Sequence, residues 1–296
     1  MEVVFLQKGK YKQPGILFDT GGFTMPRIRP AAVAGAFYAA HPSVLATNID
    51  ALLKEAQTKV SAESKVPKVL IVPHAGYIYS GPIAATAYAH LIPARERIGR
   101  VVLLGPAHRV YVAGMALAGV DAFATPLGLV EIDLEAIKML EHFSEVKTMA
   151  AAHQLEHALE VQLPFLQCLL PRFKLVPLVV GDVGPEKVEA VLEHLWGAEE
   201  TLILISSDLS HYHSYAEACV LDQETAKAIL NEQETLNSHQ ACGCMPLNGF
   251  LRVARRRGLI SRLLDLRNSG DTAGDKKQVV GYGAFGFYEP GTGLAD

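Results

Sequence analysis

The stretch that decides the fold is Val69-Leu70-Ile71-Val72-Pro73-His74-Ala75-Gly76-Tyr77, a short aliphatic run that passes directly into a polar signature. A continuous aliphatic run of this length is typical of a strand that is buried on both faces, as in a parallel sheet covered by helices. Similar runs occupy residues 101–104, 175–180 and 202–205. Together these runs predict one sheet with helices on both of its faces.

Helical patterns fill the intervals between these runs, and this alternation is typical of an α/β protein. Residues 278–288 alternate Val, Tyr, Phe and Gly, which predicts a closing strand. We therefore predict one α/β domain over residues 25–290, with a largely parallel central sheet flanked by helices. The expected helices are residues 48–59, 82–91, 134–143, 157–170, 185–195, 215–230 and 246–257.

The two ends of the chain differ in character from this domain. Residues 1–24 are punctuated by Lys and Gly and lack the apolar core of a signal peptide. We interpret them as an N-terminal extension with Met25 as the functional start, and an edge strand over residues 3–6 is the alternative. Residues 291–296 are interpreted as a C-terminal tail.

Composition narrows the class of protein. The chain has 296 residues, with 27 basic and 31 acidic side chains and a formal net charge of −4. The basic residues form no stripe, which argues against a nucleic-acid partner. No run of 18 apolar residues is present, which argues against a membrane span. Four cysteines are too few for a disulfide framework in so long a chain, and a reducing, cytoplasmic setting is expected.

Histidines follow several of the predicted strands. His74 comes after residues 69–72, His108 after residues 101–104, and the motif that ends in His211 comes after residues 202–205. Ligands of open α/β sheets bind outside the carboxyl ends of the strands, so these side chains are expected to share a pocket. Imidazole is the commonest metal ligand in proteins, and two imidazoles leave an ion needing a further donor. The candidates for that donor are Cys242, Cys244, Asp208, Glu156 and Glu160.

Two further motifs have more than one interpretation. His157 and Glu160 stand three residues apart, a spacing that some metal sites use, but the same spacing is typical of a capped, solvated first turn of a helix, which we favour here. Cys242-Gly243-Cys244 precedes the helix expected from Pro246, and a helix N-terminus lowers the pKa of a nearby thiol. Structural metal sites usually pair two such cysteine elements, and this chain has one.

Six motifs in sequence order resemble the Memo-like family, whose bacterial and archaeal members are called AmmeMemoRadiSam system protein B. The resemblance covers about residues 27–289. The motifs are Ala34-Gly35-Ala36-Phe37-Tyr38, Pro73-His74-Ala75-Gly76-Tyr77, Gly105-Pro106-Ala107-His108, Glu156-His157-Ala158-Leu159-Glu160, Ser206-Ser207-Asp208-Leu209-Ser210-His211 and Ala241-Cys242-Gly243.

The Memo-like family is similar in fold to the LigB-type class III extradiol dioxygenases, which are non-haem iron enzymes. The resemblance implies that His74, His108 and Cys242 are metal ligands, with Cys242 standing where the dioxygenases use a carboxylate. Iron is the metal first expected. A thiolate softens the site and shifts its preference toward copper(I) or zinc, which are the alternatives.

The resemblance also implies roles for residues beyond the ligands. His211 and Asp208 are expected to be catalytic, with His211 as the acid/base group, and Tyr38 and Tyr77 are expected to bind the substrate. One hypothesis is a metal-dependent, dioxygenase-like redox enzyme acting on a small molecule. A second is a non-catalytic metal- or peptide-binding protein whose partners are the radical-SAM and companion proteins of the AmmeMemoRadiSam system. Metal-assisted hydrolysis ranks last, because no hydrolase signature is present.

Overall fold

The computed structural model describes residues 25–58, 60 and 65–291. The extension predicted over residues 1–24, its alternative edge strand and residues 292–296 of the tail lie outside this range. The helices are α1 (Pro42–Gln57), α2 (Tyr77–Ala89), α3 (Leu134–Lys138), α4 (Ala150–Gln154), α5 (Leu163–Leu169), α6 (Pro185–His194), α7 (Tyr215–Leu230) and α8 (Cys244–Arg257), with short 3₁₀ helices η1 (Ile92–Ala94), η2 (Glu160–Gln162) and η3 (Ser269–Asp271).

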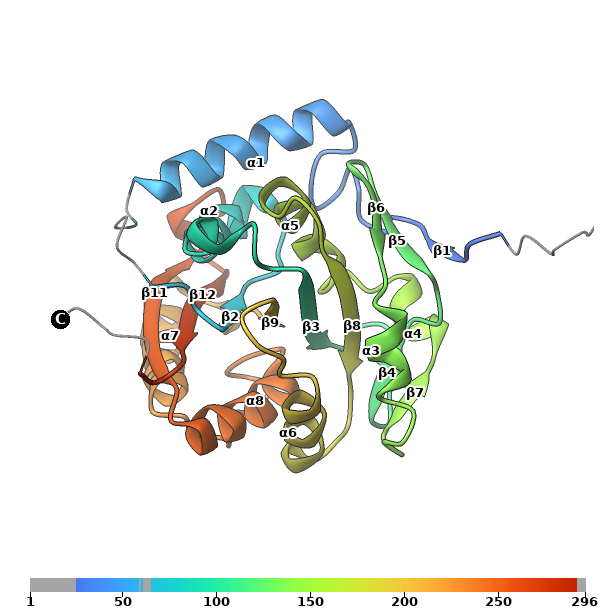
Figure 1. The fold of residues 1–296 in the computed structure, drawn as a ribbon. Coiled ribbons are helices and arrows are strands. Elements are labelled where there is room, and N and C mark those ends of the chain that lie inside the picture. The colour runs from blue at the N-terminus through green and yellow to red at the C-terminus, as the bar shows by residue number, and fades with distance from the viewer. Residues whose placement is uncertain (1–24, 59, 61–64, 292–296) are drawn as a thin grey trace, which may run out of the picture.

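A nine-stranded sheet forms the centre of the molecule (Figure 1). Its strands run in the order β10-β12-β2-β9-β3-β8-β4-β7, with β11 paired to β12, and a second sheet has the order β1-β5-β6. The strands are β1 (Ile28–Arg29), β2 (Val69–Val72), β3 (Arg100–Pro106), β4 (Met115–Leu117), β5 (Ala122–Thr125), β6 (Gly128–Glu131), β7 (Val146–Thr148), β8 (Lys174–Val180), β9 (Thr201–Ser206), β10 (His211–His213), β11 (Ile260–Asn268) and β12 (Val279–Tyr288).

The central sheet is mixed, which corrects the prediction of a largely parallel one. The strands β2, β9, β3 and β8 are parallel neighbours, as expected from their aliphatic runs. The strand β12 pairs antiparallel with β2, β10 and β11, and β4 pairs antiparallel with β8. The single α/β domain is confirmed, but only its four central strands form the parallel block.

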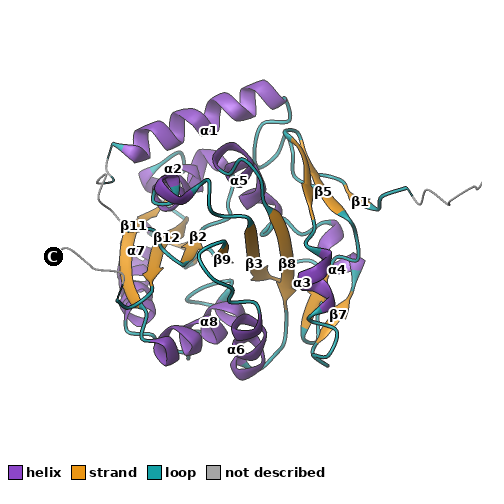
Figure 2. Cartoon of the chain, in the orientation of Figure 1, coloured by secondary structure: helices purple, strands orange, loops and turns teal. Residues whose placement is uncertain are grey.

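Helices cover both faces of this sheet (Figure 2). Side chains alternate along a strand, so Leu70 and Val72 face one hydrophobic core while Val69 and Ile71 face the other. The first core includes side chains from α1, α2 and α5, and the second includes side chains from α6, α7 and α8. Burial on both faces explains why the central strands are continuously apolar.

Several helices differ from their predicted bounds. The helix α2 begins at Tyr77 and contains Pro82, which was expected to start it, and α8 begins at Cys244 rather than at Pro246. The helix expected over residues 157–170 is shorter, because η2 and α5 start only at Glu160 and Leu163. No helix in the described part of the chain combines the length and apolar character that a membrane crossing needs.

Candidate metal centre

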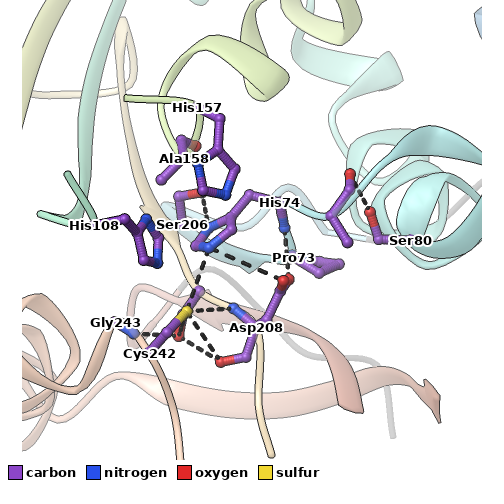
Figure 3. A network of polar contacts seen from close by, with 12 residues as sticks. Pro73, His74, Ser80, His108, His157, Ala158, Ser206, Asp208, Cys242 and Gly243 are labelled. Atoms are coloured by element: carbon purple, nitrogen blue, oxygen red, sulfur yellow. Dashed lines mark hydrogen bonds and ion pairs between the residues drawn. The ribbon is translucent and has the colours of Figure 1, made fainter. Parts of the chain in front are cut away.

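Three histidines meet where the parallel strands end. His74 follows β2 and His108 follows β3, and the strand β9 lies between these two. The ring centroids of His74 and His108 are 5.2 Å apart. His157 comes from the turn before η2, with its ring centroid 5.3 Å from that of His74 and 4.7 Å from that of His108. Each ring offers a nitrogen, and these three atoms lie within 4.8 Å of one another (Figure 3).

His157 was expected in a solvated helical turn, and this expectation was wrong. Its side chain is only 14 % exposed, and the residues around it form a turn rather than an α-helix. The carboxylate of Glu156 sets that turn, because its Oε1 accepts a hydrogen bond from the backbone N–H of Ala158 at 2.9 Å. Its Oε2 accepts one from the backbone N–H of His108 at 2.7 Å, which fixes the turn beside the end of β3.

The same carboxylate orients the ring of His108. The Nδ1 of His108 lies 2.9 Å from Oε1 of Glu156, and a carboxylate can only accept, so Nδ1 carries the proton. The lone pair of the neutral ring is then on Nε2. Burial raises the pKa of Glu156, but hydrogen bonding to His108 and the contact with His157 outweigh burial and hold the pKa below its usual range.

A buried hydroxyl orients the ring of His74 in a similar way. The Ser206 hydroxyl donates its proton to the carbonyl of Ala158 at 2.7 Å and accepts a hydrogen bond from the Gln162 amide at 2.9 Å. The Nδ1 of His74 lies 2.8 Å from the same oxygen, which has a lone pair left to accept its proton. Both His74 and His108 therefore have an unprotonated Nε2 that can bind a metal, as the ligands of known metal sites do when a second-sphere partner holds the other nitrogen.

The Nδ1 of His157 has no hydrogen-bond partner, although this atom is buried. It lies 3.2 Å from Oε1 of Glu156, but without the alignment of a hydrogen bond. Buried polar atoms are normally paired, and an unpaired one at a cluster of imidazoles needs an explanation. A metal ion bound by the cluster would supply one.

The thiol of Cys242 lies beside this cluster (Figure 3). Its Sγ is 3.3 Å from Nε2 of His74 and accepts a hydrogen bond from the backbone N–H of Asp208 at 3.3 Å. Burial, and then the charge of Asp208, raise the pKa of Cys242 rather than lower it as the sequence predicted. The second cysteine, Cys244, is buried within the first turn of α8, where burial also raises its pKa.

The two residues expected to be catalytic follow β9 in the chain. Oδ1 of Asp208 accepts a hydrogen bond from the backbone N–H of His74 at 2.7 Å, and its Oδ2 is 4.0 Å from Nε2 of His74. Burial raises the pKa of Asp208 against the opposing hydrogen bond from His74 and the charge of His211. His211 begins β10, outside the three-histidine cluster. Their catalytic roles stay predictions.

The other predicted site residues are engaged within the protein. The hydroxyl of Tyr38 donates to Glu160 at 2.5 Å, and that of Tyr77 donates to the carbonyl of Val161 at 2.7 Å. Glu160, a candidate donor in the sequence, is fully buried and forms an ion pair with Arg29. Substrate binding by Tyr38 and Tyr77 stays a prediction, and neither phenol has a free proton to give.

The structure thus defines an α/β protein with a histidine-lined centre at the carboxyl ends of its parallel strands. Residues 29–285 match the family model described as Memo-like protein. The chain is 37 % identical over 273 residues to a MEMO1 family protein of Aquifex aeolicus, covering 86 % of this chain and 97 % of that protein. It is 34 % identical over 283 residues to a MEMO1 family protein of Sulfolobus acidocaldarius, with the same coverages. The chain belongs to the Memo-like family.

Proposed function

We propose that the protein binds one transition-metal ion at His74, His108 and His157, with Cys242 as a fourth donor. The observation that carries this proposal is the convergence of three imidazole nitrogens within 4.8 Å of one another. The hydrogen bonds of Ser206 and Glu156 support it, because they leave Nε2 available on two of the rings.

The thiol of Cys242 stands outside the group of three imidazoles and contacts it through His74. Its Sγ lies 3.3 Å from Nε2 of His74, close to the roughly 3.5 Å that separates sulfur and nitrogen donors in a tetrahedral zinc site. The Cys242 thiol must lose its proton to bind a metal ion. Burial raises the pKa of this thiol, but coordination to a metal ion drives the loss of the proton. With three imidazoles and one thiolate, the set favours iron(II), zinc or copper(I) over magnesium or calcium.

We further propose a dioxygenase-like redox activity, which rests on the resemblance to the LigB-type enzymes. A bound iron ion would supply the redox chemistry. Asp208 holds the backbone of His74 in place through its 2.7 Å hydrogen bond. His211 is the proposed acid/base group, and its charge acts on both Asp208 and His74. Contacts of Tyr38 and Tyr77 with a substrate would use their rings, because both hydroxyls donate within the protein.

Elemental analysis after anaerobic purification without a metal-affinity column tests the metal site. We expect about one metal ion per chain in the wild type and a marked loss in His157→Ala and Cys242→Ala. The matched control is His239→Ala, which removes an exposed histidine. Full retention of metal in His157→Ala would overturn the three-histidine set. Oxygen consumption by the iron-loaded protein with catechols and thiols tests the redox activity separately.

The second candidate function is the binding of a peptide segment from a partner protein, without turnover. Four large apolar side chains, each within four residues of a site residue, are 61–73 % exposed: Ile78, Tyr111, Leu155 and Tyr212. Tyr212 has a φ of 63°, a left-handed conformation that is costly for a tyrosine. Large exposed apolar side chains in the segments that carry the site residues would suit a protein-binding surface. The proposed partners are companion proteins of the AmmeMemoRadiSam system, including its radical-SAM protein.

Pull-down of those companion proteins distinguishes the two functions. We expect Tyr111→Ser combined with Tyr212→Ser to lose the partner while retaining metal. Exposed Val220 on α7 is the control position, and Val220→Ser should bind like the wild type. Partner capture that survives the double substitution would contradict this second function.

A further inference from the structure

A cationic cavity lies beside β11, and its lining shares no residue with the histidine cluster. It has a volume of about 560 Å³, and its lining includes Lys65, His90, Arg262 and Tyr288. Tyr288 ends β12 and pairs with Ile260 at the start of β11, and the neighbouring Phe287 pairs with Val69 at the start of β2. The lining extends along β11 from Arg262 to Arg267, which pairs with Tyr282 of β12.

The lining carries an excess of positive charge. It contains Lys65, Arg262 and Arg267 against a single carboxylate, that of Asp265. Arg267 neutralises this carboxylate through two contacts, 3.0 Å from Nε to Oδ1 and 2.5 Å from a terminal nitrogen to Oδ2. Within the described part of the chain, no carboxylate pairs with the side chain of Lys65 or Arg262. Among the described residues, Lys65 and Arg262 are therefore left without a counter-charge.

A buried nitrogen at the same cavity also lacks a partner. The Nδ1 of His90 is buried and makes no hydrogen bond. Burial, and then the guanidinium of Arg262, lower the pKa of His90, and the same two causes lower the pKa of Lys65. The positive charges of Lys65 and Arg262 repel each other, so a bound anion would be favourable for both.

We propose that this cavity binds a phosphate monoester of a small organic molecule. Lysine and arginine side chains are suited to the oxygens of a phosphate dianion, and Lys65 and Arg262 balance its charge. The cavity is much larger than a phosphate group and falls within the range of small-molecule sites. The ring of Tyr288 and the side chains of Leu263 and Leu264 provide an apolar wall for the organic part.

Isothermal titration calorimetry at constant ionic strength tests the proposal on the full chain. The two probes are inorganic phosphate and phenyl phosphate, and we expect phenyl phosphate to bind more tightly. Arg262→Gln should weaken binding of phenyl phosphate about tenfold or more, because a charge-assisted contact is lost. Lys65→Gln repeats the test from a different segment of the chain. The control is Arg256→Gln at the end of α8, where the arginine is 68 % exposed.

The outcomes separate the phosphate site from non-specific attraction. Absence of binding by both probes at millimolar concentration, or equal weakening by Arg256→Gln, would overturn the proposal. Equal affinity for the two probes would overturn its assignment to an ester. A shift of the His90 ring resonances on addition of phenyl phosphate, absent in Arg262→Gln, would support binding in this cavity. Because no probe involves the metal ion, these results are independent of the proposed metal centre.

Discussion

The carboxylate of Glu156 offers the sharpest test of how the metal centre is built. Glu156 accepts hydrogen bonds from His108 Nδ1, His108 N and Ala158 N, so three donors converge on its two oxygens. The substitution Glu156→Gln leaves one oxygen to accept and places an N–H group where the other oxygen was. At least one of the three donors then faces another donor.

We expect this substitution to lower metal affinity about 10–100-fold, the usual effect of removing a second-sphere partner. The physical reason is that an uncharged amide no longer fixes the proton of His108 on Nδ1, and the ring can turn or change tautomer. Metal affinity is measured by competition with a chromophoric chelator, and thermal unfolding of the metal-free protein reports separately on the fold. Glu156→Asp keeps the charge and should lose less affinity than Glu156→Gln.

A double-mutant cycle shows whether Glu156 acts through His108. If it does, Glu156→Gln should cost much less affinity in a His108→Ala background than in the wild type. A small loss of metal affinity should remain in the His108→Ala background, because Glu156 also contacts His157. An equal loss in both backgrounds would refute the reasoning, because it would mean that Glu156 supports the fold without orienting the imidazole.

Three further predictions concern the thiol and two buried networks. In the cobalt(II)-substituted protein, Cys242→Ser should abolish the thiolate-to-cobalt charge-transfer absorption, and an unchanged band would exclude Cys242 as a ligand. Burial lowers the pKa of His153 to about 4, whereas the unfolded chain binds this proton near 6.5. The stability that depends on a neutral His153 is therefore fully present above about pH 6.5, and it is lost as the pH falls toward 4. The free energy of unfolding in urea should fall between pH 7 and pH 5 by about 2 kcal/mol less in His153→Gln than in the wild type. The same fall in both proteins would contradict this. Glu160→Gln leaves the buried guanidinium of Arg29 unpaired and should cost about 3–5 kcal/mol in the same assay, so a loss below 1 kcal/mol would be inconsistent with the ion pair.

The parallel strands at the centre of the sheet could be predicted from the sequence, because a strand that is buried on both faces is continuously aliphatic. The strands β2, β3, β8 and β9 all lie on the aliphatic runs that predicted them. The edge strand β11 was not predicted, since it carries Arg262, Asp265 and Arg267 among its apolar residues. Charged residues are common on edge strands, where they discourage further pairing, and they hide the alternation that identifies a strand.

The candidate site was predicted in part. The sequence placed His74 and His108 at strand ends, and the structure brings their rings together. It did not identify His157, because its spacing from Glu160 also fits a helical turn. The observed turn is set by the hydrogen bond between Glu156 and His108, which is 48 residues away in the chain. Helical periodicity describes only neighbouring residues, so it cannot predict a contact over this separation. The adjacent carboxylate and imidazole at residues 156 and 157 were the one local signal available.

Two glycines in the site motifs, Gly105 and Gly243, lie where another segment packs closely against the backbone. A Cβ atom on Gly105 in β3 would lie 3.3 Å from Cβ of Ala158 and 2.8 Å from the side chain of Leu159, in the turn that carries His157. A Cβ atom on Gly243 would lie 2.7 Å from Cβ of Ser207, just after β9. Glycine at these positions lets the turn of His157 and the segment of Cys242 rest directly against the strand ends.

Strand order explains why these two segments are needed. The strand β9 separates β2 from β3, so His74 and His108 reach the centre from either side of it, and the end of β9 contributes the small side chain of Ser206 beneath them. The parallel block alone therefore supplies two of the three clustered imidazoles. His157 comes from a segment outside the block, which is why a rule about strand ends identified His74 and His108 but not His157, whose turn is set by the contacts of Glu156. The proposed fourth donor, Cys242, also lies outside the block, where its Sγ accepts a hydrogen bond from the backbone N–H of Asp208.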